Sequence, residues 1–398
     1  MKVLWVNTNF MHPTTKGGQI RTLEMLRKLH QRHEIHYAAI EDPDEPEGVA
    51  RAHEYCTKVY PFRHRLPGKR SPAFALQVAA SVFQSQPIGI TRFCSPEMGR
   101  ALERIAEKEH FDRAVCDFLT PAGHFPRIEK AVVFQHNVET MVRRRYAEHV
   151  SSALGRWYFH LQAERMFRFE REICLKAGHV VAVSEQDACT MREMFGVQRV
   201  SAVPTGVDID YLGGDPQPIT TDLVFVGSMD WIPNIEGMQW FVREVLPIIR
   251  RSRPDCTVAI VGRMPPPSIT ALAEQDSRIR VTGTVPDIRP YLWSSAVSIV
   301  PLRIGGGTRL KIYESMAARV PVVSTTIGAE GLEIHPPDDI RIGDSAEAFA
   351  AECLDLLSHE DVRTRVAAAA RDMVASRFSW DEVAKAFERI LESAPDYR

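Results

Sequence analysis

The chain has 398 residues, of which 44% are hydrophobic and 25% charged, and its formal net charge is −2. This composition is typical of a soluble globular protein. The length predicts two domains of about 150–200 residues each. Seven scattered cysteines without a C-x-x-C pair argue against a disulfide framework or a zinc site and favour reduced thiols in the cytoplasm. No apolar run is long enough to span a membrane, and the N-terminal apolar run is too short for a signal peptide.

The first half of the chain predicts a parallel α/β domain. A strand at Val3–Val6 is followed by a loop rich in glycine, proline and threonine (7–18), a helix at Gln19–His30 and a strand at Glu34–Ile40. Residues 41–70, rich in proline and charge, are interpreted as a loop. The alternation then continues with a helix at about Pro96–Lys108 and strands at Arg113–Cys116, Ala131–Gln135 and His179–Val183.

Residues 138–176 are predicted to form one long helical stretch in which aromatic residues and arginines lie on adjoining faces. Such a face is typical of interfacial helices, and a basic cluster at 63–70 has the same character. Residues 1–205 hold 29 Lys and Arg against 23 Asp and Glu (+6), whereas the rest hold 20 against 28 (−8). The basic half could contact an anionic membrane; a partly buried helix with snorkelling arginines, and the solvated faces of two domains, give the same pattern.

A proline- and glycine-rich piece, residues 205–222, is predicted to link two domains. Just before it, Ser184 and Asp187 nearly match a capping box at the start of a helix. A second α/β run follows the linker. Its predicted elements are strands at Leu223–Val226, Thr257–Val261, Ile279–Val281, Val297–Val300 and Pro321–Ser324 and helices at Gly237–Arg250 and Ile288–Trp293.

The most informative stretch of this second run is Gly305-Gly306-Gly307, which lies between a buried strand and a helix expected to begin near Thr308. Glycines allow a close backbone approach, and the first turn of a helix offers unpaired N–H groups that suit a phosphate. With Arg309 and Lys311 beside it, the loop is interpreted as a diphosphate cradle, and Glu314 could accept hydrogen bonds from a sugar or ribose diol. A tight turn before an ordinary helix is the alternative.

Taken in order, eight short motifs resemble those of the retaining glycosyltransferases of family 4. They are Gly17-Gly18, His136–Glu139, Val181–Glu185, Val203–Asp208, Phe225–Asp230, Gly283–Asp287, Gly305–Glu314 and Pro321–Ser324. The resemblance implies a GT-B fold, with two Rossmann-like, doubly wound parallel-sheet domains facing across a cleft. It predicts an acceptor-side domain of residues 1–204 plus about 376–398, the linker 205–222, and a donor-binding domain of residues 223–375. The segment from Phe378 would cross back to the first domain.

The same resemblance implies roles for individual residues. His136 would contact the donor sugar, Glu314 the ribose, and Gly17 and Gly18 would place N–H groups near the phosphate. In this family amides, a helix N-terminus and cations usually stabilise the leaving diphosphate, so no metal or other cofactor is expected. The remaining expected donor contacts are Gly227, Ser228, Asn234, Arg263, Gly305, Gly306, Gly307, Thr308 and Leu310, with Gly283 and Val285 at the nucleobase.

The sequence departs from the family pattern in ways that affect the donor site. Gly306 replaces the first carboxylate of the E-x7-E motif, and the usual Arg and Lys of the first loop fall near Ser228 and Asn234, which are neutral. Arg309 and Lys311 are the expected substitutes, and Arg263 is a weaker one. Asp208-Ile209-Asp210 looks like a metal-binding D-x-D motif but lies in the linker, so it is interpreted as a turn.

The predicted activity is transfer of a sugar, with retention, from a UDP- or GDP-type nucleotide sugar to a glycan, lipid-linked or small-molecule acceptor, in surface polysaccharide or glycoconjugate synthesis. No nucleic-acid partner is expected. Two alternatives stay open: a nucleotide-sugar epimerase of the same fold, and a catalytically silent nucleotide-sugar-binding protein.

Overall fold

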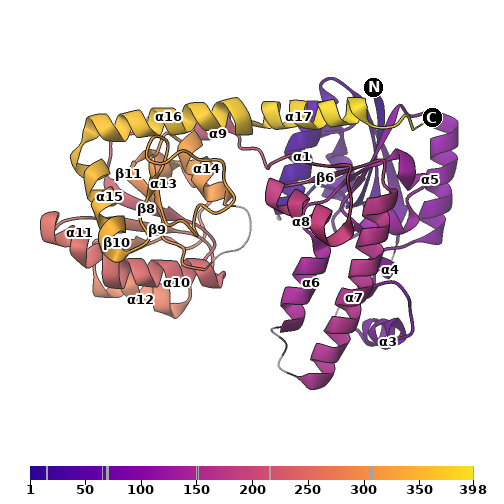
Figure 1. The fold of residues 1–398 in the computed structure, drawn as a ribbon, viewed down its shortest axis with the longest axis horizontal. Coiled ribbons are helices and arrows are strands. Elements are labelled where there is room, and N and C mark those ends of the chain that lie inside the picture. The colour runs from indigo at the N-terminus through magenta and orange to yellow at the C-terminus, as the bar shows by residue number, and fades with distance from the viewer. Residues whose placement is uncertain are drawn as a thin grey trace. The chain divides into compact units, whose positions relative to one another are not determined.

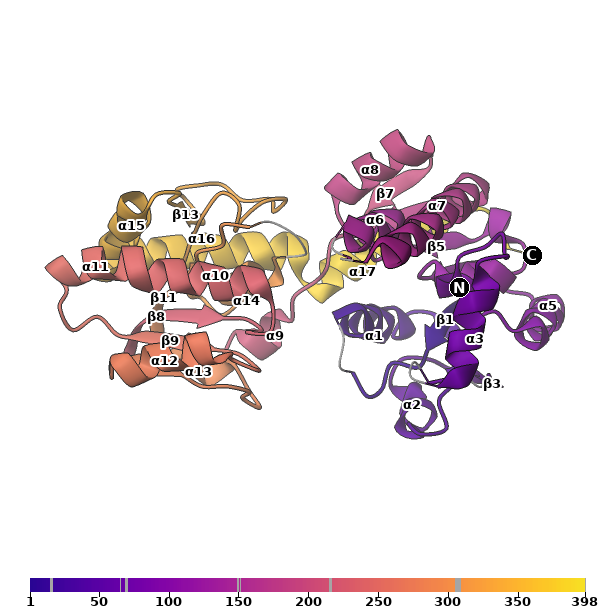
Figure 2. The ribbon, with the colours of Figure 1, turned by 90° about the horizontal axis from the view of Figure 1, so that it is seen from below.

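A computed structural model describes residues 1–14, 17–64, 66–68, 71–148, 150, 152–214, 217–304 and 309–397. The chain divides into two compact units, Met1–Thr205 with Val383–Arg398, and Gly206–Glu382. Each unit contains one parallel β-sheet with helices around it (Figures 1 and 2). The chain is therefore an α/β protein with two Rossmann-like units.

The first unit contains a seven-stranded sheet of order β3-β2-β1-β4-β5-β6-β7. Its strands are β1 (Lys2–Asn9), β2 (Glu34–Glu41), β3 (Lys58–Arg63), β4 (Arg113–Asp117), β5 (Val132–Phe134), β6 (His179–Ala182) and β7 (Val200–Ala202). Its helices are α1 (Gly17–His30), α2 (Glu47–Ala50), α3 (Pro72–Ser81), α4 (Ile88–Thr91), α5 (Pro96–Glu109), α6 (Glu139–Glu148), α7 (Ala153–Lys176) and α8 (Glu185–Phe195), with short 3-10 helices at Ala52–Glu54, Thr120–His124 and Ile128–Lys130.

The second unit contains a six-stranded sheet of order β10-β9-β8-β11-β12-β13. Its strands are β8 (Thr221–Val226), β9 (Val258–Val261), β10 (Ile279–Val281), β11 (Ser295–Val300), β12 (Val322–Ser324) and β13 (Arg341–Ile342). Its helices are α9 (Ile209–Leu212), α10 (Ile232–Trp240), a π-helical turn (Phe241–Val245), α11 (Leu246–Ser252), α12 (Pro267–Gln275), α13 (Arg289–Trp293), α14 (Leu310–Ala317), α15 (Ala346–Ser358) and α16 (Glu360–Phe378); α17 (Trp380–Ser393) contributes residues to both units.

Alternate residues of the central strands belong to different hydrophobic cores. In β8, Leu223 and Phe225 pack with α10, α11, α12 and α15, whereas Val224 packs with α9, α13, α14 and α16. Side chains alternate across a strand, so a strand covered on both faces must be apolar at nearly every position. This is the physical reason that the central strands could be recognised in the sequence as continuous apolar runs.

Three sequence predictions of secondary structure were wrong. Residues 41–70 include α2 and the edge strand β3, where Pro61 is tolerated because an edge strand needs fewer ladder hydrogen bonds. The stretch 138–176 contains two helices, because Ser152 caps a new one by accepting a hydrogen bond from Gly155 N at 3.1 Å. The helix predicted at Gly237 begins at Ile232, with a proline in its first turn. By contrast, Ser184 does cap α8 and accepts from Asp187 N at 3.0 Å.

The C-terminal segment of the first unit is anchored by aromatic side chains. Phe387 of α17 is fully buried against Trp5 of β1 and Phe134 of β5, with ring centroids 5.5 and 5.1 Å apart. The hydroxyl of Tyr397 donates to Pro126 O at 2.8 Å. Among the described residues, no helix combines the length and apolarity needed to cross a bilayer.

We expect Phe387→Ala to lower the free energy of unfolding of the first unit by about 3–5 kcal/mol, because it opens a cavity between two other rings. Arg389→Ala, an exposed change on the same helix, should alter it by less than about 0.5 kcal/mol. Urea unfolding followed by tryptophan fluorescence compares the two. Equal midpoints for both variants would show that α17 does not stabilise this unit.

Candidate functional site

In the first unit, the loops that follow β1 and β4 leave the sheet at the point where its strand order reverses. The chain passes from β1 to β2 and β3 on one side and then to β4–β7 on the other. In open parallel sheets, ligands bind beyond the carboxyl ends of the strands at such a switch point. Asn7 near the end of β1, Asp117 at the end of β4 and the glycine pair that starts α1 all lie there.

Asp117 is the centre of a buried hydrogen-bond network at this point. Its Oδ2 accepts hydrogen bonds from three side chains and its Oδ1 faces a fourth. The donors to Oδ2 are Trp5 Nε1 (3.0 Å), Asn7 Nδ2 (2.7 Å) and Thr22 Oγ1 (2.8 Å), and the fourth partner is His136 Nε2 (2.7 Å). A fully buried carboxylate is stable only when it is paired in this way. The network therefore joins β1, α1, β4 and the segment after β5.

His136 is held rigidly on three sides. Nε2 donates to Asp117, and Nδ1 lies 3.5 Å from the Arg21 guanidinium. Phe118 stacks on the imidazole at 3.8 Å with the rings 7° apart. Burial lowers the pKa of His136, although Asp117 opposes this shift. The lowered pKa favours the neutral ring, in which Nδ1 is a hydrogen-bond acceptor. Because Nε2 is bonded to Asp117, a ligand hydroxyl that reaches the ring would compete with Arg21 for Nδ1.

Phe118 and Gly18 form a tight contact beside this histidine. Phe118 has φ = 69°, a conformation that is unusual for an aromatic residue and that clusters at functional sites. A Cβ on Gly18 would lie 2.7 Å from Phe118 Cζ, whereas a Cβ on Gly17 would meet nothing within 4 Å. Glycine is therefore required at position 18 for space and not at position 17.

Arg21, in the second turn of α1, brings a buried positive charge to the same place. It is 5% exposed, and burial lowers its pKa to about 10 despite the opposing carboxylates of Asp117 and Asp187. Its Nε has no hydrogen-bond partner among the described residues. A buried guanidinium of this kind is suited to an anionic or hydroxyl-rich ligand.

The segment that carries His136 is anchored by a buried carboxylate on α7. Glu170 accepts from Glu139 N (2.9 Å), Thr140 N (2.7 Å) and Thr140 Oγ1 (2.5 Å), and so caps the first turn of α6. Burial raises the pKa of Glu170 to about 7, although these three hydrogen bonds oppose the rise.

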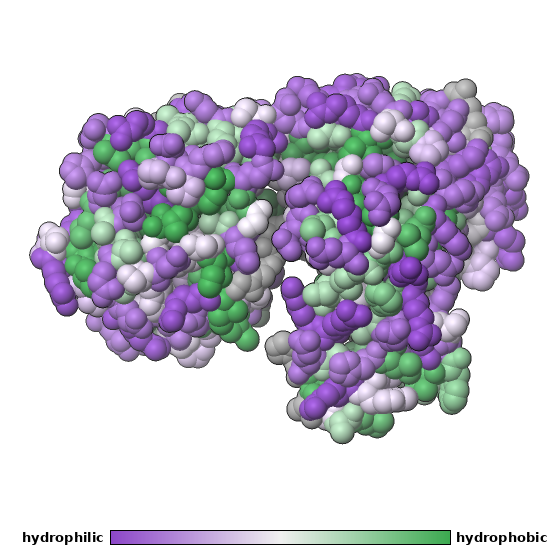
Figure 3. Space-filling model, in the orientation of Figure 1, coloured by the Kyte–Doolittle hydropathy of each residue, from purple (hydrophilic) through white to green (hydrophobic). Residues whose placement is uncertain are grey.

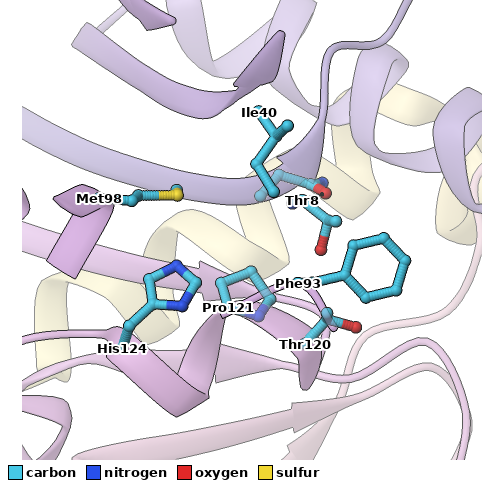
Figure 4. Close-up of a pocket in the computed structure, with 8 residues that line it drawn as sticks. Thr8, Ile40, Phe93, Met98, Thr120, Pro121 and His124 are labelled. Atoms are coloured by element: carbon cyan, nitrogen blue, oxygen red, sulfur yellow. Dashed lines mark hydrogen bonds between the residues drawn. The ribbon is translucent and has the colours of Figure 1, made fainter. Parts of the chain in front are cut away.

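A second group of side chains gathers near the carboxyl ends of β1 and β2. Thr8, Ile40, Phe93, Met98, Thr120, Pro121 and His124 converge there (Figure 4). Burial lowers the pKa of His124 to about 4, so this imidazole is neutral. The mixture of apolar and hydroxyl side chains forms a small recess, but it is filled too closely to hold a ligand without side-chain movement.

In the second unit, the strand order reverses between β8 and β11, and Lys311 of α14 lies at that switch point. Its ammonium donates to Asn234 Oδ1 of α10 at 2.8 Å and lies 4.4 Å from the centroid of the Phe225 ring. Burial lowers the pKa of Lys311 to about 7; the nearby Arg309 adds to this effect and Glu314 opposes it. A cation from α14 thus occupies the first loop of this unit, where the sequence comparison indicated only the neutral Ser228 and Asn234.

Three glycines allow the close approach that this arrangement needs. A Cβ on Gly227 would lie 2.6 Å from Lys311 Nζ and 3.0 Å from Asn234 Nδ2. A Cβ on Gly262 would overlap Gly227 O, and one on Gly237 would lie 2.6 Å from Pro301 O. A side chain at position 227 would crowd Lys311 and Asn234, whereas the glycines at 237 and 262 let backbone segments approach each other.

The other predicted residues of α14 have different surroundings. Burial raises the pKa of Glu314, one turn after Lys311, and the lysine opposes this shift. Arg309 is buried and donates to Ile327 O at 3.1 Å. The side chain of Leu310 packs on the hydrophobic core, which leaves its backbone as the part able to meet a ligand. The structure brings Gly227, Asn234 and Lys311 together.

The remaining predicted donor residues lie around this group. Arg263 donates to Ser228 Oγ at 2.7 Å and pairs with Asp230, so part of its charge is already compensated. Gly283 has φ = 69°, and Val285 packs against the core cluster. Asp208 caps α9, so the D-x-D sequence begins a short helix. Gly305, Gly306, Gly307 and Thr308 lie outside the described residues.

Sequence profiles of two families match the two units. The profile described as "Glycosyltransferase Family 4" matches residues 15–211, and that described as "Glycosyl transferases group 1" matches residues 220–359. The chain belongs to the group 1, family 4 glycosyltransferases. This glycosyltransferase is also 24% identical over 141 residues to an uncharacterized 44.6 kDa protein from the cps region of Klebsiella pneumoniae, a match that spans 34% of the chain and 36% of that relative.

Solved structures with the same fold cover almost the whole glycosyltransferase. Sucrose-phosphate synthase from Thermosynechococcus elongatus is 16% identical with a TM-score of 0.66, and the match covers 99% of this chain and 98% of the other. HepE of Anabaena, solved in complex with UDP, is 14% identical with a TM-score of 0.65 and coverage of 99% and 100%. A glycosyltransferase from Rickettsia africae is 15% identical, with a TM-score of 0.62 and 98% coverage of both chains. The fold is GT-B.

Sequence reasoning missed three residues of the first site: Arg21, Asp117 and Phe118. A weak signal existed for Asp117, because it directly follows an apolar strand and so had to lie at the carboxyl edge of the sheet. Phe118 carried none, since its positive φ is visible only in the structure.

Gly18→Ala should push Phe118 away from His136 and lower the free energy of unfolding by about 1–3 kcal/mol, the range expected for overpacking. Gly17→Ala, with open space around the added methyl group, is the matched control and should be neutral or slightly stabilising. Denaturant midpoints measure both changes. A neutral Gly18→Ala would contradict the proposed packing requirement.

Proposed function

We propose that this glycosyltransferase transfers a sugar, with retention, from a nucleotide-diphosphate sugar to a glycan, lipid-linked or small-molecule acceptor. The observation that carries the proposal is Lys311, a half-buried cation at the switch point of the second sheet that is held by an amide oxygen and an aromatic ring rather than by a carboxylate. Its charge is therefore available to an anion, and a diphosphate is the anion that a donor in this fold presents. We assign the donor to the second unit and the acceptor to the first.

The donor is proposed to be of the UDP or GDP type. Support for UDP comes from HepE, whose structures were solved with UDP and with UDP-glucose. In this proposal Glu314 binds the ribose hydroxyls, and the loop of Gly283 and Val285 contacts the nucleobase. Lys311 and Arg309 stabilise the leaving diphosphate, and no metal ion is required.

The surroundings of Asp117 bear on the route by which the proposed retention would occur, not on the stereochemical outcome itself. A carboxylate whose oxygens accept several hydrogen bonds is a poor nucleophile, so a double displacement through it is disfavoured. We therefore infer a same-face displacement in which the departing diphosphate helps to deprotonate the acceptor. The anomeric configuration of the first product, read by proton NMR, tests this step, and an inverted product would refute it.

Synthesis of a surface polysaccharide or glycoconjugate is the proposed setting. The partial match to a protein of a cps region supports it. A lipid-linked acceptor would be met at a membrane, and peripheral contact of the first unit with an anionic membrane is part of the proposal.

We expect the affinity for UDP to fall roughly five- to tenfold between pH 7.5 and 8.5. Without ligand, Lys311 is charged below about pH 7 and loses its proton above that pH. A bound phosphate favours the charged side chain, so UDP binding above pH 7 takes up a proton and weakens as the pH rises. The terminal phosphate has a pKa near 6 and does not titrate in this range. Calorimetry in buffers of different ionisation enthalpy measures both effects.

Lys311→Arg is the matched control for this pH dependence, because a guanidinium stays charged throughout. It should bind UDP with little change over the same range. A flat profile in the wild type, or an equal slope in the arginine variant, would exclude Lys311 as the titrating group.

Glu314→Gln should lower kcat/KM for donor turnover by about tenfold or more, because it removes a charged hydrogen bond worth about 1.5–3 kcal/mol. Glu274→Gln, at an exposed position on α12, should leave turnover unchanged. EDTA should have no effect. Full activity in Glu314→Gln, or loss with EDTA, would overturn the assignment, and conversion of the donor without an acceptor would indicate the epimerase instead.

A further inference from the structure

One surface of the first unit is apolar although it is not packed. Helix α3 has the sequence Pro-Ala-Phe-Ala-Leu-Gln-Val-Ala-Ala-Ser, with no charged residue, and most of its positions are exposed. Leu76 is 71% exposed, and Phe83, just beyond the helix, is 90% exposed. A helix that is apolar on all sides is normally buried in a core or in lipid. The main hydrophobic cluster of this unit, however, includes no residue of α3.

Helix α3 is attached to the unit by its C-terminal end, through polar contacts with α7. The hydroxyl groups of Ser81 and Tyr158 lie 2.8 Å apart. The Arg165 guanidinium donates to Val82 O at 2.7 Å and also to Ser81 O. These contacts hold the last turn, and Arg92 lies over the ring of Phe74 in the first turn, whereas Leu76 and Phe83 stay exposed.

Further apolar side chains are exposed where α6 ends and α7 begins. Leu154 and Trp157, one turn or less from Tyr158, are 76% and 53% exposed, and Tyr146 of α6 is 59% exposed. In Figure 1, α6 and α7 extend away from the sheet as a pair with α3 beside α7, and apolar atoms gather over this end in Figure 3. We call the surface of Leu76, Phe83, Tyr146, Leu154 and Trp157 the tip surface.

The chain segments that carry the tip surface are basic in sequence. Residues 64–96, which include α3, contain no aspartate or glutamate and have four cations, Arg65, Lys69, Arg70 and Arg92, of which the first three lie outside the described residues. Residues 140–163 contain four arginines (Arg143, Arg144, Arg145, Arg156) and one acidic residue, Glu148. Exposed leucine and aromatic side chains in segments rich in arginine and lysine are typical of elements that lie in a lipid headgroup layer.

We propose that the tip surface docks this glycosyltransferase on an anionic membrane. Its aromatic and leucine side chains enter the headgroup layer, and the surrounding cations are attracted by the negative lipids, each contributing to binding near the surface. A second copy of the chain would bring positive charge against positive charge, which disfavours self-association through this face. The proposal specifies the surface for the peripheral location included in the proposed function and does not depend on the sugar chemistry.

Co-sedimentation with phospholipid vesicles tests the proposal. The 398-residue chain should bind vesicles that contain about one quarter phosphatidylglycerol, bind pure phosphatidylcholine vesicles weakly, and detach as salt approaches about 0.5 M. The double variant Leu76→Ser with Phe83→Ser, and separately Trp157→Ser, should reduce binding to anionic vesicles by about tenfold or more. Leu175→Ser, an exposed leucine at the other end of α7, is the matched control and should bind as the wild type does.

Three results would overturn the proposal: no binding of the wild type to anionic vesicles, equal loss of binding in the Leu175 control, or a wild-type dimer that the double variant converts to a monomer. The thermal shift with UDP, measured on the same samples, separates this proposal from the catalytic one. Stabilisation by UDP without vesicle binding would refute only the docking surface. Vesicle binding without stabilisation by UDP would leave the docking surface standing and refute only a UDP-type donor.

Discussion

Both sheets of this glycosyltransferase begin with an interior strand, β1 in the first unit and β8 in the second, and all strands are parallel. The carboxyl ends of all strands therefore lie at the same edge of each sheet. The loop after β1 or β8 leads to one side of the sheet, and the loop after the adjacent strand, β4 or β11, leads to the other. The space opened there cannot be filled by a crossover helix, so it is where polar side chains can meet a ligand. Asp117 and Lys311 lie at these two points.

The two units stabilise a buried charge at this point by opposite means. Asp117 is surrounded by donors, which makes it a fixed structural centre that orients His136. Lys311 has the amide oxygen of Asn234 and the ring of Phe225 as neighbours, and burial lowers its pKa to about 7. A carboxylate whose oxygens are occupied contributes rigidity, whereas a cation that is not hydrogen-bonded to a carboxylate can gain free energy from an incoming anion.

Helix α3, at the periphery of the first unit, contributes no residue to the main hydrophobic cluster of that unit. Helix α3 is held by hydrogen bonds from α7 to its last turn, which require no hydrophobic contact. Leu76 and Phe83 are therefore left exposed, whereas Phe74 is partly covered by Arg92. An exposed apolar surface is costly in water, and contact with a partner that covers it, in our proposal an anionic membrane, offsets that cost.

Lys311 and Glu314 of the second unit could be selected from the sequence because they follow one strand within a few residues, whereas Gly227 and Asn234 follow another strand and were expected only from the family resemblance. The first site was predicted less completely. His136 and the glycine pair were found, but Asp117 and Phe118 acquire their meaning only from contacts with side chains elsewhere in the chain. The interpretation of 138–176 as one helix was wrong for a local reason, the capping of a new helix by Ser152.

The sequence by itself determined the two successive α/β units, the glycosyltransferase family and most of the strands, because parallel strands buried on both faces leave continuous apolar runs and family motifs are local. Only the tertiary structure decided that Lys311 reaches Asn234, 77 positions away, and that α3 keeps its apolar side chains exposed. Contacts of that kind depend on how separate elements pack, and the spacing of residues along the chain carries no record of it.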